Sequence, residues 1–181
     1  MENNKKGSIE VICGPMFSGK TEELIRRLVR GQIAKKKVFI FKHSMDNRYS
    51  EDYIVSHNKN KIKCHSIVES IQINDFSDRI DIIGIDEAQF FDSSIIDVCN
   101  KLANNGKRVI VAGLDRDYKA IPFGPMANLL AHADHIKKLS AICMCCGNQA
   151  TFSQRLTTDD NQILVGESEK YEARCRNCYK P

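Results

Sequence analysis

A phosphate-binding loop can be recognised near the start of the chain, where GPMFSGKT fits the pattern G-x-x-x-x-G-K-T. Its glycines let backbone N–H groups approach phosphate oxygens with no Cβ in the way. The lysine can reach the outer phosphates, and the threonine hydroxyl can ligate Mg²⁺. The eight residues are Gly14, Pro15, Met16, Phe17, Ser18, Gly19, Lys20 and Thr21. The pattern predicts a site for a nucleoside triphosphate and Mg²⁺.

Two adjacent acids, Asp86 and Glu87, follow an apolar run that begins at Ile80. An apolar strand that ends in an acid is the Walker B arrangement, in which Asp86 would hold Mg²⁺, usually through water. Neighbouring side chains on a strand point to different sides. Glu87 can therefore accept a proton or position a nucleophile while Asp86 serves the metal.

Four cysteines near the C-terminus form two C-x-x-C pairs: Cys143 with Cys146, and Cys175 with Cys178. Two such turns supply four soft ligands for a tetrahedral Zn²⁺ ion, and four cysteines leave no open position for water. The pattern predicts a structural zinc rather than a catalytic one. Free thiols or redox chemistry are the alternative. Cys145, between the first two ligands, is expected to point away.

The composition is that of a globular protein, with 181 residues, 42% of them hydrophobic, and a net charge of +4. No apolar run approaches the roughly 18 residues of a membrane span, and residues 1–7 are polar, unlike a secretory signal. We therefore expect a cytoplasmic protein with reduced thiols and no membrane partner. The basic residues are scattered, which is weak support for a nucleic-acid partner.

The elements that must position these groups are predicted to alternate. A β-rich run at 8–13, a helix over 21–34 and a strand at 38–41 form a βαβ unit around the loop, which favours a parallel sheet. Polar loops should follow the strands at 38–41 and 107–113, and the first contains Asp46 and Arg48. Loops at the carboxyl ends of strands line ligand crevices in such sheets. Both residues are thus candidates for the site.

The C-terminal segment is predicted to consist of short strands and loops instead of alternating strands and helices. The strand predicted over 135–142 should lead out of the sheet, and short strands at 151–155 and 162–166 should pair with each other. A polar loop over 167–171 would then form a tethered lid. We predict an α/β fold with a P-loop domain at 1–140 and a zinc-binding domain at 141–181.

Two functions remain open on these residues. In a small-molecule kinase Glu87 would be the base for a substrate hydroxyl. In a nucleic-acid motor the sequence DEAQ would be a helicase box and the cysteine module would grip DNA. The short chain, without a clear arginine finger or a dense basic stripe, favours the kinase.

The motifs together resemble the cytosolic-type (type II) thymidine kinases. The resemblance runs from about Ile9 to Tyr179 and rests on five features in order: GPMFSGKT, DNRYS at 46–50, DEAQFF at 86–91, GLD at 113–115 with the Phe123-Gly124 pair, and the two C-x-x-C pairs. It implies transfer of the ATP γ-phosphate to the 5′-hydroxyl of thymidine or deoxyuridine. It also implies a RecA-like domain, a zinc-bearing lasso domain at residues 141–181, a homotetramer and inhibition by dTTP.

The same resemblance implies residue roles. Glu87 would take the 5′-hydroxyl proton. ATP phosphates and Mg²⁺ would be held by the loop together with Asp46, Arg48, Asp86 and Gln89. Thymidine would be contacted by Met16, Phe90, Leu114, Tyr118, Phe123, Ser153, Val165, Gly166 and Tyr171.

Overall fold

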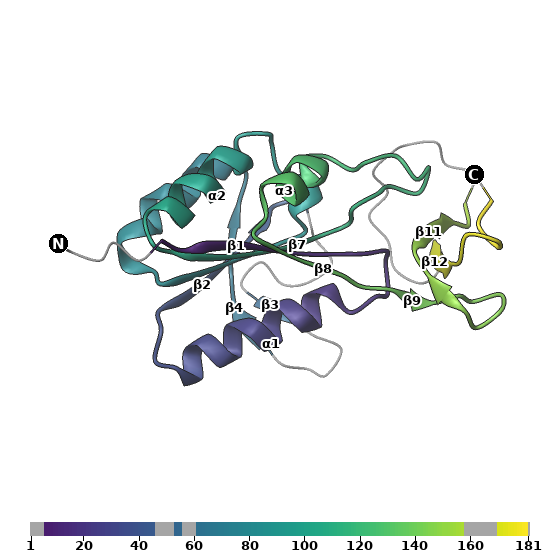
Figure 1. The fold of residues 1–181 in the computed structure, drawn as a ribbon, viewed down its shortest axis with the longest axis horizontal. Coiled ribbons are helices and arrows are strands. Elements are labelled where there is room, and N and C mark those ends of the chain that lie inside the picture. Colours follow the sequence, from purple (N-terminus) through teal and green to yellow (C-terminus); the bar gives the residue numbers. More distant parts are fainter. Residues whose placement is uncertain (1–5, 46–52, 56–60, 158–169, 181) are drawn as a thin grey trace.

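A six-stranded parallel sheet forms the centre of the computed structural model, which describes residues 6–45, 53–55, 61–157 and 170–180 (Figure 1). The strand order is β5-β2-β6-β7-β1-β8, and all neighbouring strands are parallel. The strands are β1 (Ser8–Cys13), β2 (Val38–His43), β5 (His65–Ile67), β6 (Ile82–Asp86), β7 (Arg108–Gly113) and β8 (His135–Lys138). The expected α/β fold is confirmed.

Helices cover both faces of the sheet. Helix α1 (Lys20–Ile33) lies on one face, and α2 (Ile95–Asn104) and α3 (Met126–His132) lie on the other (Figure 1). The 3₁₀ segments η1 (Ser70–Arg79) and η2 (Ala88–Phe90) follow β5 and β6. Because both faces are covered, the inner strands can be apolar along their whole length. Residues of β6 alternate between the two core clusters, with Ile82 packed in the α1 cluster and Ile83 in the α2 cluster.

Helix α1 approaches β6 closely because glycine occupies both contact points. A Cβ on Gly84 would lie 2.6 Å from Leu28 Cδ1, and a Cβ on Gly31 would lie 2.5 Å from Ile82 Cδ1. Leu24 and Leu28 fill the remaining contact and are fully buried. This packing holds α1, whose first two residues are the lysine and threonine of the loop, against the sheet.

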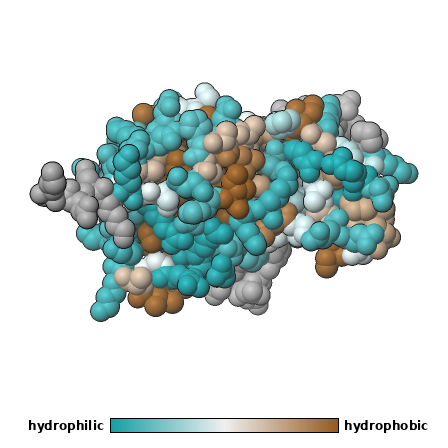
Figure 2. Space-filling view, viewed as in Figure 1, coloured by the Kyte–Doolittle hydropathy of each residue, from teal (hydrophilic) through white to brown (hydrophobic). Residues whose placement is uncertain are grey.

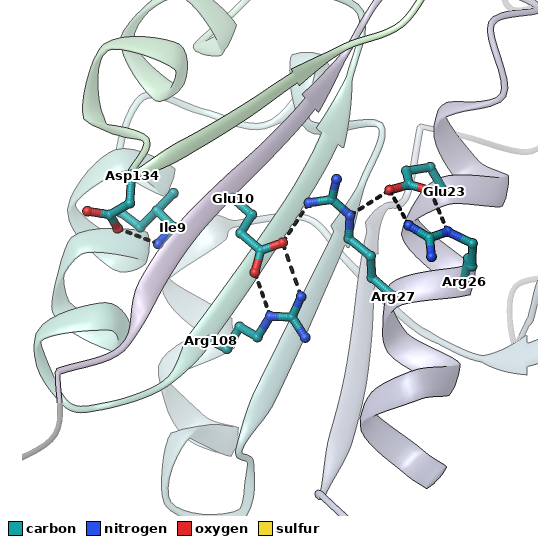
Figure 3. A network of polar contacts seen from close by, with 7 residues as sticks. All are labelled: Ile9, Glu10, Glu23, Arg26, Arg27, Arg108 and Asp134. Atoms are coloured by element: carbon teal, nitrogen blue, oxygen red, sulfur yellow. Dashed lines mark hydrogen bonds and ion pairs between the residues drawn. The ribbon is translucent and has the colours of Figure 1, made fainter. Parts of the chain in front are cut away.

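Ion pairs fix the same helix to the sheet from the side (Figure 3). Glu10 on β1 binds Arg27 of α1 at 2.6 Å and Arg108 of β7 at 2.5 Å. Arg27 also binds Glu23, at 2.8 Å. Burial alone would raise the pKa of Glu10, but the two arginines outweigh it and lower that pKa. The carboxylate therefore stays charged and joins three elements.

Strand β8 corrects one expectation. Residues 135–142 were expected to lead out of the sheet as one strand, but His135–Lys138 pairs with β1 as the sheet's edge strand. Only β9 (Ala141–Ile142) leaves it, to pair with β10 (Gln149–Ala150). All four β8 residues are exposed. An edge strand without a buried face shows no alternation that the sequence could reveal.

A second correction concerns the partner of β11 (Phe152–Arg155). It pairs antiparallel with β12 (Tyr171–Arg174), a segment expected to be partly loop, rather than with 162–166, which lies outside the described residues. The second C-x-x-C turn begins at Cys175, directly after β12, so this turn fixes where the strand ends. Strands β3 (Tyr53–Val55) and β4 (Lys61–Lys63) pair antiparallel as a separate two-stranded sheet.

Most of the face drawn in Figure 2 is hydrophilic, and hydrophobic residues gather mainly over α3 and the segments beside it. In the part of the chain that the structure describes, no helix is both long enough and apolar enough to cross a membrane.

Candidate active site

The phosphate-binding loop connects β1 to α1, as its pattern predicts. Gly14 has φ of 148° and Gly19, which precedes α1, has φ of 80°, values that L side chains adopt with strain. Lys20 Nζ and Ser18 Oγ each donate a hydrogen bond to the carbonyl of Pro15, both at 2.8 Å. Two side chains of the loop therefore bind the loop's own backbone at Pro15 in this structure.

Thr21 and Asp86 meet at the carboxyl end of the sheet. Thr21 Oγ1 lies 3.2 Å from Asp86 Oδ2, across 65 positions of sequence. Asp86 is the last residue of β6 and is only 6% exposed. A hydroxyl and a carboxylate are oxygen ligands of the kind that Mg²⁺ prefers. These two side chains can hold Mg²⁺ beside the loop.

Glu87 follows in an unusual backbone conformation. Its φ of 51° and ψ of 44° lie in the left-handed region, although it is not glycine. Its N–H donates to Asp86 Oδ1 at 3.0 Å. Such conformations cost about 1–3 kcal/mol and concentrate at functional sites. The chain therefore turns at Glu87, directly after Asp86 at the end of β6.

Gln89 lies between Glu87 and the loop after β7. Its Nε2 donates to Glu87 Oε2, and its Oε1 accepts the N–H of Leu114 at 3.0 Å. The next residue, Phe90, contacts Phe123 edge-on with 5.8 Å between ring centroids. Gln89 thus links Glu87 to Leu114, one of the residues expected around thymidine.

A hydrogen bond joins the P-loop to strand β11, which lies between the two C-x-x-C pairs. The N–H of Met16 donates to Ser153 Oγ at 2.9 Å, and Ser153 is buried on β11. The structure thereby places two of the expected thymidine contacts, one from each end of the chain, next to each other.

Arg155 is a residue that the sequence reasoning missed. Its guanidinium stacks over the Tyr118 ring at 3.6 Å, and its Nε donates to the hydroxyl of Tyr171 at 3.2 Å. It is only 6% exposed, which is rare for arginine. Both tyrosines are expected thymidine contacts, so Arg155 fixes their relative position. An arginine in a short polar strand gave no signal of this role.

The four predicted zinc ligands come together. The sulfur atoms of Cys143, Cys146, Cys175 and Cys178 all lie within 4.8 Å of one another. Zn–S bonds of about 2.3 Å in a tetrahedron require S···S distances near 3.8 Å, and Cys146 and Cys175 are 3.6 Å apart. Hydrogen bonds from backbone N–H groups lower the pKa of Cys143 to about 6, and the largest contribution comes from Cys175. The thiolate form of Cys143 is therefore favoured, whereas hydrogen bonds with Cys175 and Cys146 raise the pKa of the Cys178 thiol.

Four expected site residues lie outside the part of the chain that the structure describes: Asp46, Arg48, Val165 and Gly166. Cys145, the odd member of the module, is exposed and stands apart from the four ligands, as expected. The other cysteines, Cys13, Cys64 and Cys99, are buried.

Comparisons with known proteins agree with this site. The family model described as thymidine kinase matches residues 7–179. A thymidine kinase of Bacteroides fragilis (strain NCTC 9343) is 57% identical over 179 residues, which cover 99% of this chain and 90% of the relative. A thymidine kinase of Bacteroides thetaiotaomicron is 55% identical over 178 residues, covering 98% and 89%. One of Rhodothermus sp. (strain ITI 518) is 53% identical over 175 residues, covering 97% and 82%.

A family model that matches nearly the whole chain, and relatives above half identity over nearly its full length, agree with the P-loop, the acidic pair and the four-cysteine cluster seen in the fold. The chain belongs to the thymidine kinase family.

Proposed function

We propose that the protein transfers the γ-phosphate of ATP to the 5′-hydroxyl of thymidine, and of deoxyuridine, giving the monophosphate for DNA synthesis. Family membership supports the substrate pair. The observation that carries the mechanism is the position of Glu87, one residue beyond Asp86, which is hydrogen-bonded to Thr21 of the loop.

The donor side is formed by the loop. Its backbone N–H groups and Lys20 would bind the phosphates, and the lysine would exchange the carbonyl of Pro15 for phosphate oxygens. Thr21 and Asp86 would hold Mg²⁺, which neutralises charge on the β- and γ-phosphates. By resemblance, Asp46 and Arg48 would serve the same group.

The transfer step requires a base. As the 5′-oxygen bonds to the γ-phosphorus, the bond from that phosphorus to the bridging oxygen breaks and ADP leaves. The hydroxyl proton passes to the Glu87 carboxylate. A hydroxyl titrates far above neutral pH, so a carboxylate held within hydrogen-bond reach of it accelerates the step. The buried position of Glu87, only 9% exposed, limits competition from water.

The acceptor pocket is proposed to combine two parts of the chain. Met16, Leu114 and Tyr171 would surround the thymine methyl, with aromatic contacts from Phe90, Tyr118 and Phe123. Ser153 and the backbone near Val165 and Gly166 would bind the edge of the base. The hydrogen bond between Met16 and Ser153 supports this arrangement because it brings the loop to the lasso.

The cysteine cluster would hold a structural Zn²⁺ that pins both ends of the segment at 151–174. Residues 141–181 would then form a zinc-binding domain joined to the P-loop domain of residues 1–140. The protein is a cytoplasmic homotetramer inhibited by dTTP, which can span the acceptor and donor phosphate sites.

A nucleoside panel tests the proposal. The protein is incubated with ATP, Mg²⁺ and each of several nucleosides, and nucleoside monophosphate is measured. We expect product from thymidine and deoxyuridine. No product from thymidine, together with ATP hydrolysis stimulated by DNA, would instead support the nucleic-acid motor.

A further inference from the structure

The side chain of Gln89 connects two parts of the candidate site. It is only 3% exposed and lies in η2, two residues beyond Glu87. Its Oε1 accepts the backbone N–H of Leu114, which can only donate, and this fixes the orientation of the amide. The Nε2 group must then face Glu87, where it donates to Oε2 at 2.5 Å.

Only an amide of this length makes both bonds. A glutamate would keep an acceptor for Leu114 but lose the donor to Glu87, and a methionine would lose both. Two glycines leave space for this residue. A Cβ on Gly113 would lie 2.9 Å from Oε1 of the Gln89 side chain, and a Cβ on Gly124 would lie 2.2 Å from the backbone carbonyl oxygen of Gln89. Gly124 also has φ of 51°, where a side chain is strained.

The bond to Oε2 matters because of how Glu87 is held. The backbone of Glu87 is set by its left-handed conformation and its bond to Asp86, but neither contact fixes the rotation of its carboxylate. The amide of Gln89 supplies that constraint. It also links the carboxylate to the backbone at Leu114, beside the proposed thymine pocket.

We propose that Gln89 is a positioning residue that orients the Glu87 carboxylate and couples it to the backbone of Leu114. The proposal rests on the proposed function, in which Glu87 is the base. A nucleoside that seats correctly against Leu114 then meets a carboxylate aligned with its 5′-hydroxyl. Loss of the amide should lower kcat and leave the KM for ATP nearly unchanged, because misplacement of a catalytic group by about 1 Å can cost about 100-fold.

The experiment is a double-mutant cycle. Gln89→Met and Gln89→Glu are each made alone and combined with Glu87→Gln, and kcat, KM for ATP, thymidine binding by calorimetry and Tm are measured. Gln32→Met, at an exposed position of α1, is the matched control. Gln89→Glu keeps the size of the side chain, so it tests the donor bond even if Gln89→Met does not fold.

We expect both single variants to lose about 10- to 100-fold in kcat, with ATP KM within about twofold. In the Glu87→Gln background the same substitutions should change the residual kcat by less than about threefold, because their effect acts through the carboxylate. A residue that only fills space would lower kcat equally in both backgrounds, and Gln89→Met, which is similar in size but makes neither hydrogen bond, would resemble the parent protein. Either result would overturn the proposal.

The two proposals fail in different ways. If Glu87→Gln alone keeps near-normal turnover, the base assignment is wrong and the role of Gln89 is wrong with it. If Glu87→Gln is inactive while the Gln89 variants keep their kcat, the base assignment stands and only the positioning role is lost.

Discussion

The backbone N–H of Met16 donates a hydrogen bond to Ser153 Oγ at 2.9 Å, so the phosphate-binding loop and strand β11 are directly joined across 137 positions of sequence. An N–H of this loop type is expected to point towards phosphate. Here one of them instead binds the hydroxyl of a buried serine in the cysteine module. The donor loop and the proposed lasso are therefore mechanically linked.

Removal of the Ser153 hydroxyl should weaken nucleoside binding more than ATP binding. In Ser153→Ala the N–H of Met16 loses its partner, which costs about 1–3 kcal/mol when the group stays buried. We expect KM for thymidine to rise several-fold, KM for ATP to change less than twofold, and Ser153→Thr to behave like the parent. Equal increases in both KM values would show that the bond supports the loop alone.

The side chain of Met16 is tested separately, because Met16→Ala keeps the backbone N–H that binds Ser153. If the thioether borders the thymine, this variant should raise KM for thymidine more than KM for ATP. An unchanged KM for thymidine would contradict the assignment of Met16 to the thymine pocket.

Removal of zinc should disorder the lasso before it unfolds the sheet. The four sulfur ligands connect β9, β12 and the turns beside them, whereas the main sheet is held by its own core clusters. We expect one zinc per chain by elemental analysis. Chelation, or the double variant Cys175→Ser with Cys178→Ser, should abolish thymidine binding while the far-UV circular dichroism of the α/β part is retained.

Cys145→Ser is the matched control for the cysteine variants, because Cys145 is exposed and lies outside the cluster. It should keep both zinc and thymidine affinity. Full thymidine affinity in the double variant would contradict the role of zinc as a lasso anchor.

The parts of the site that could be predicted were those with a fixed chemical pattern. The P-loop, the pair Asp86-Glu87 and the four cysteines each combine residue type with spacing, and the structure brings each group together as that spacing required. The inner strands were equally readable, because burial on both faces leaves a continuous apolar run.

The parts that could not be predicted depend on contacts between distant segments. Strand β8 has no buried face, so its place at the sheet edge follows only from pairing with β1. Arg155 gains its role from Tyr118 and Tyr171, which the sequence does not place beside it. Gln89 stands in a recognisable motif, but its two hydrogen bonds depend on the left-handed turn at Glu87.

Asp92 should make the protein sensitive to acid. Burial would raise its pKa, but hydrogen bonds from Ser70 and Ser94 outweigh it and hold the pKa at about 2. These bonds join η1 to the start of α2. In the unfolded chain an aspartate has a pKa of about 3.9, so at lower pH the unfolded state binds more protons than the folded state does. The stabilisation is complete above about pH 4 and is lost as the pH falls towards 2.

Thermal melts between pH 7 and pH 2.5 test this. Asp92→Asn should have a lower Tm at pH 7 and a smaller fall in Tm between pH 4 and pH 2.5, because the titrating group is gone. Asp75→Asn, at an exposed position of η1, is the control and should follow the parent. Parallel curves for Asp92→Asn and the parent would assign the acid sensitivity to other carboxylates, such as Glu23, whose hydrogen bonds from Arg26 and Arg27 lower its pKa to about 2.

The most direct test of the account is turnover of thymidine by Glu87→Gln, measured beside ATP and thymidine binding in the same preparation. Glutamine keeps an oxygen that can accept the hydrogen bond from Gln89, so we expect the fold and both affinities to be retained. Without a base for the 5′-hydroxyl, kcat should fall by about 10²- to 10⁴-fold. Turnover within a few-fold of the parent, with both substrates bound normally, would contradict the assignment of Glu87 as the base.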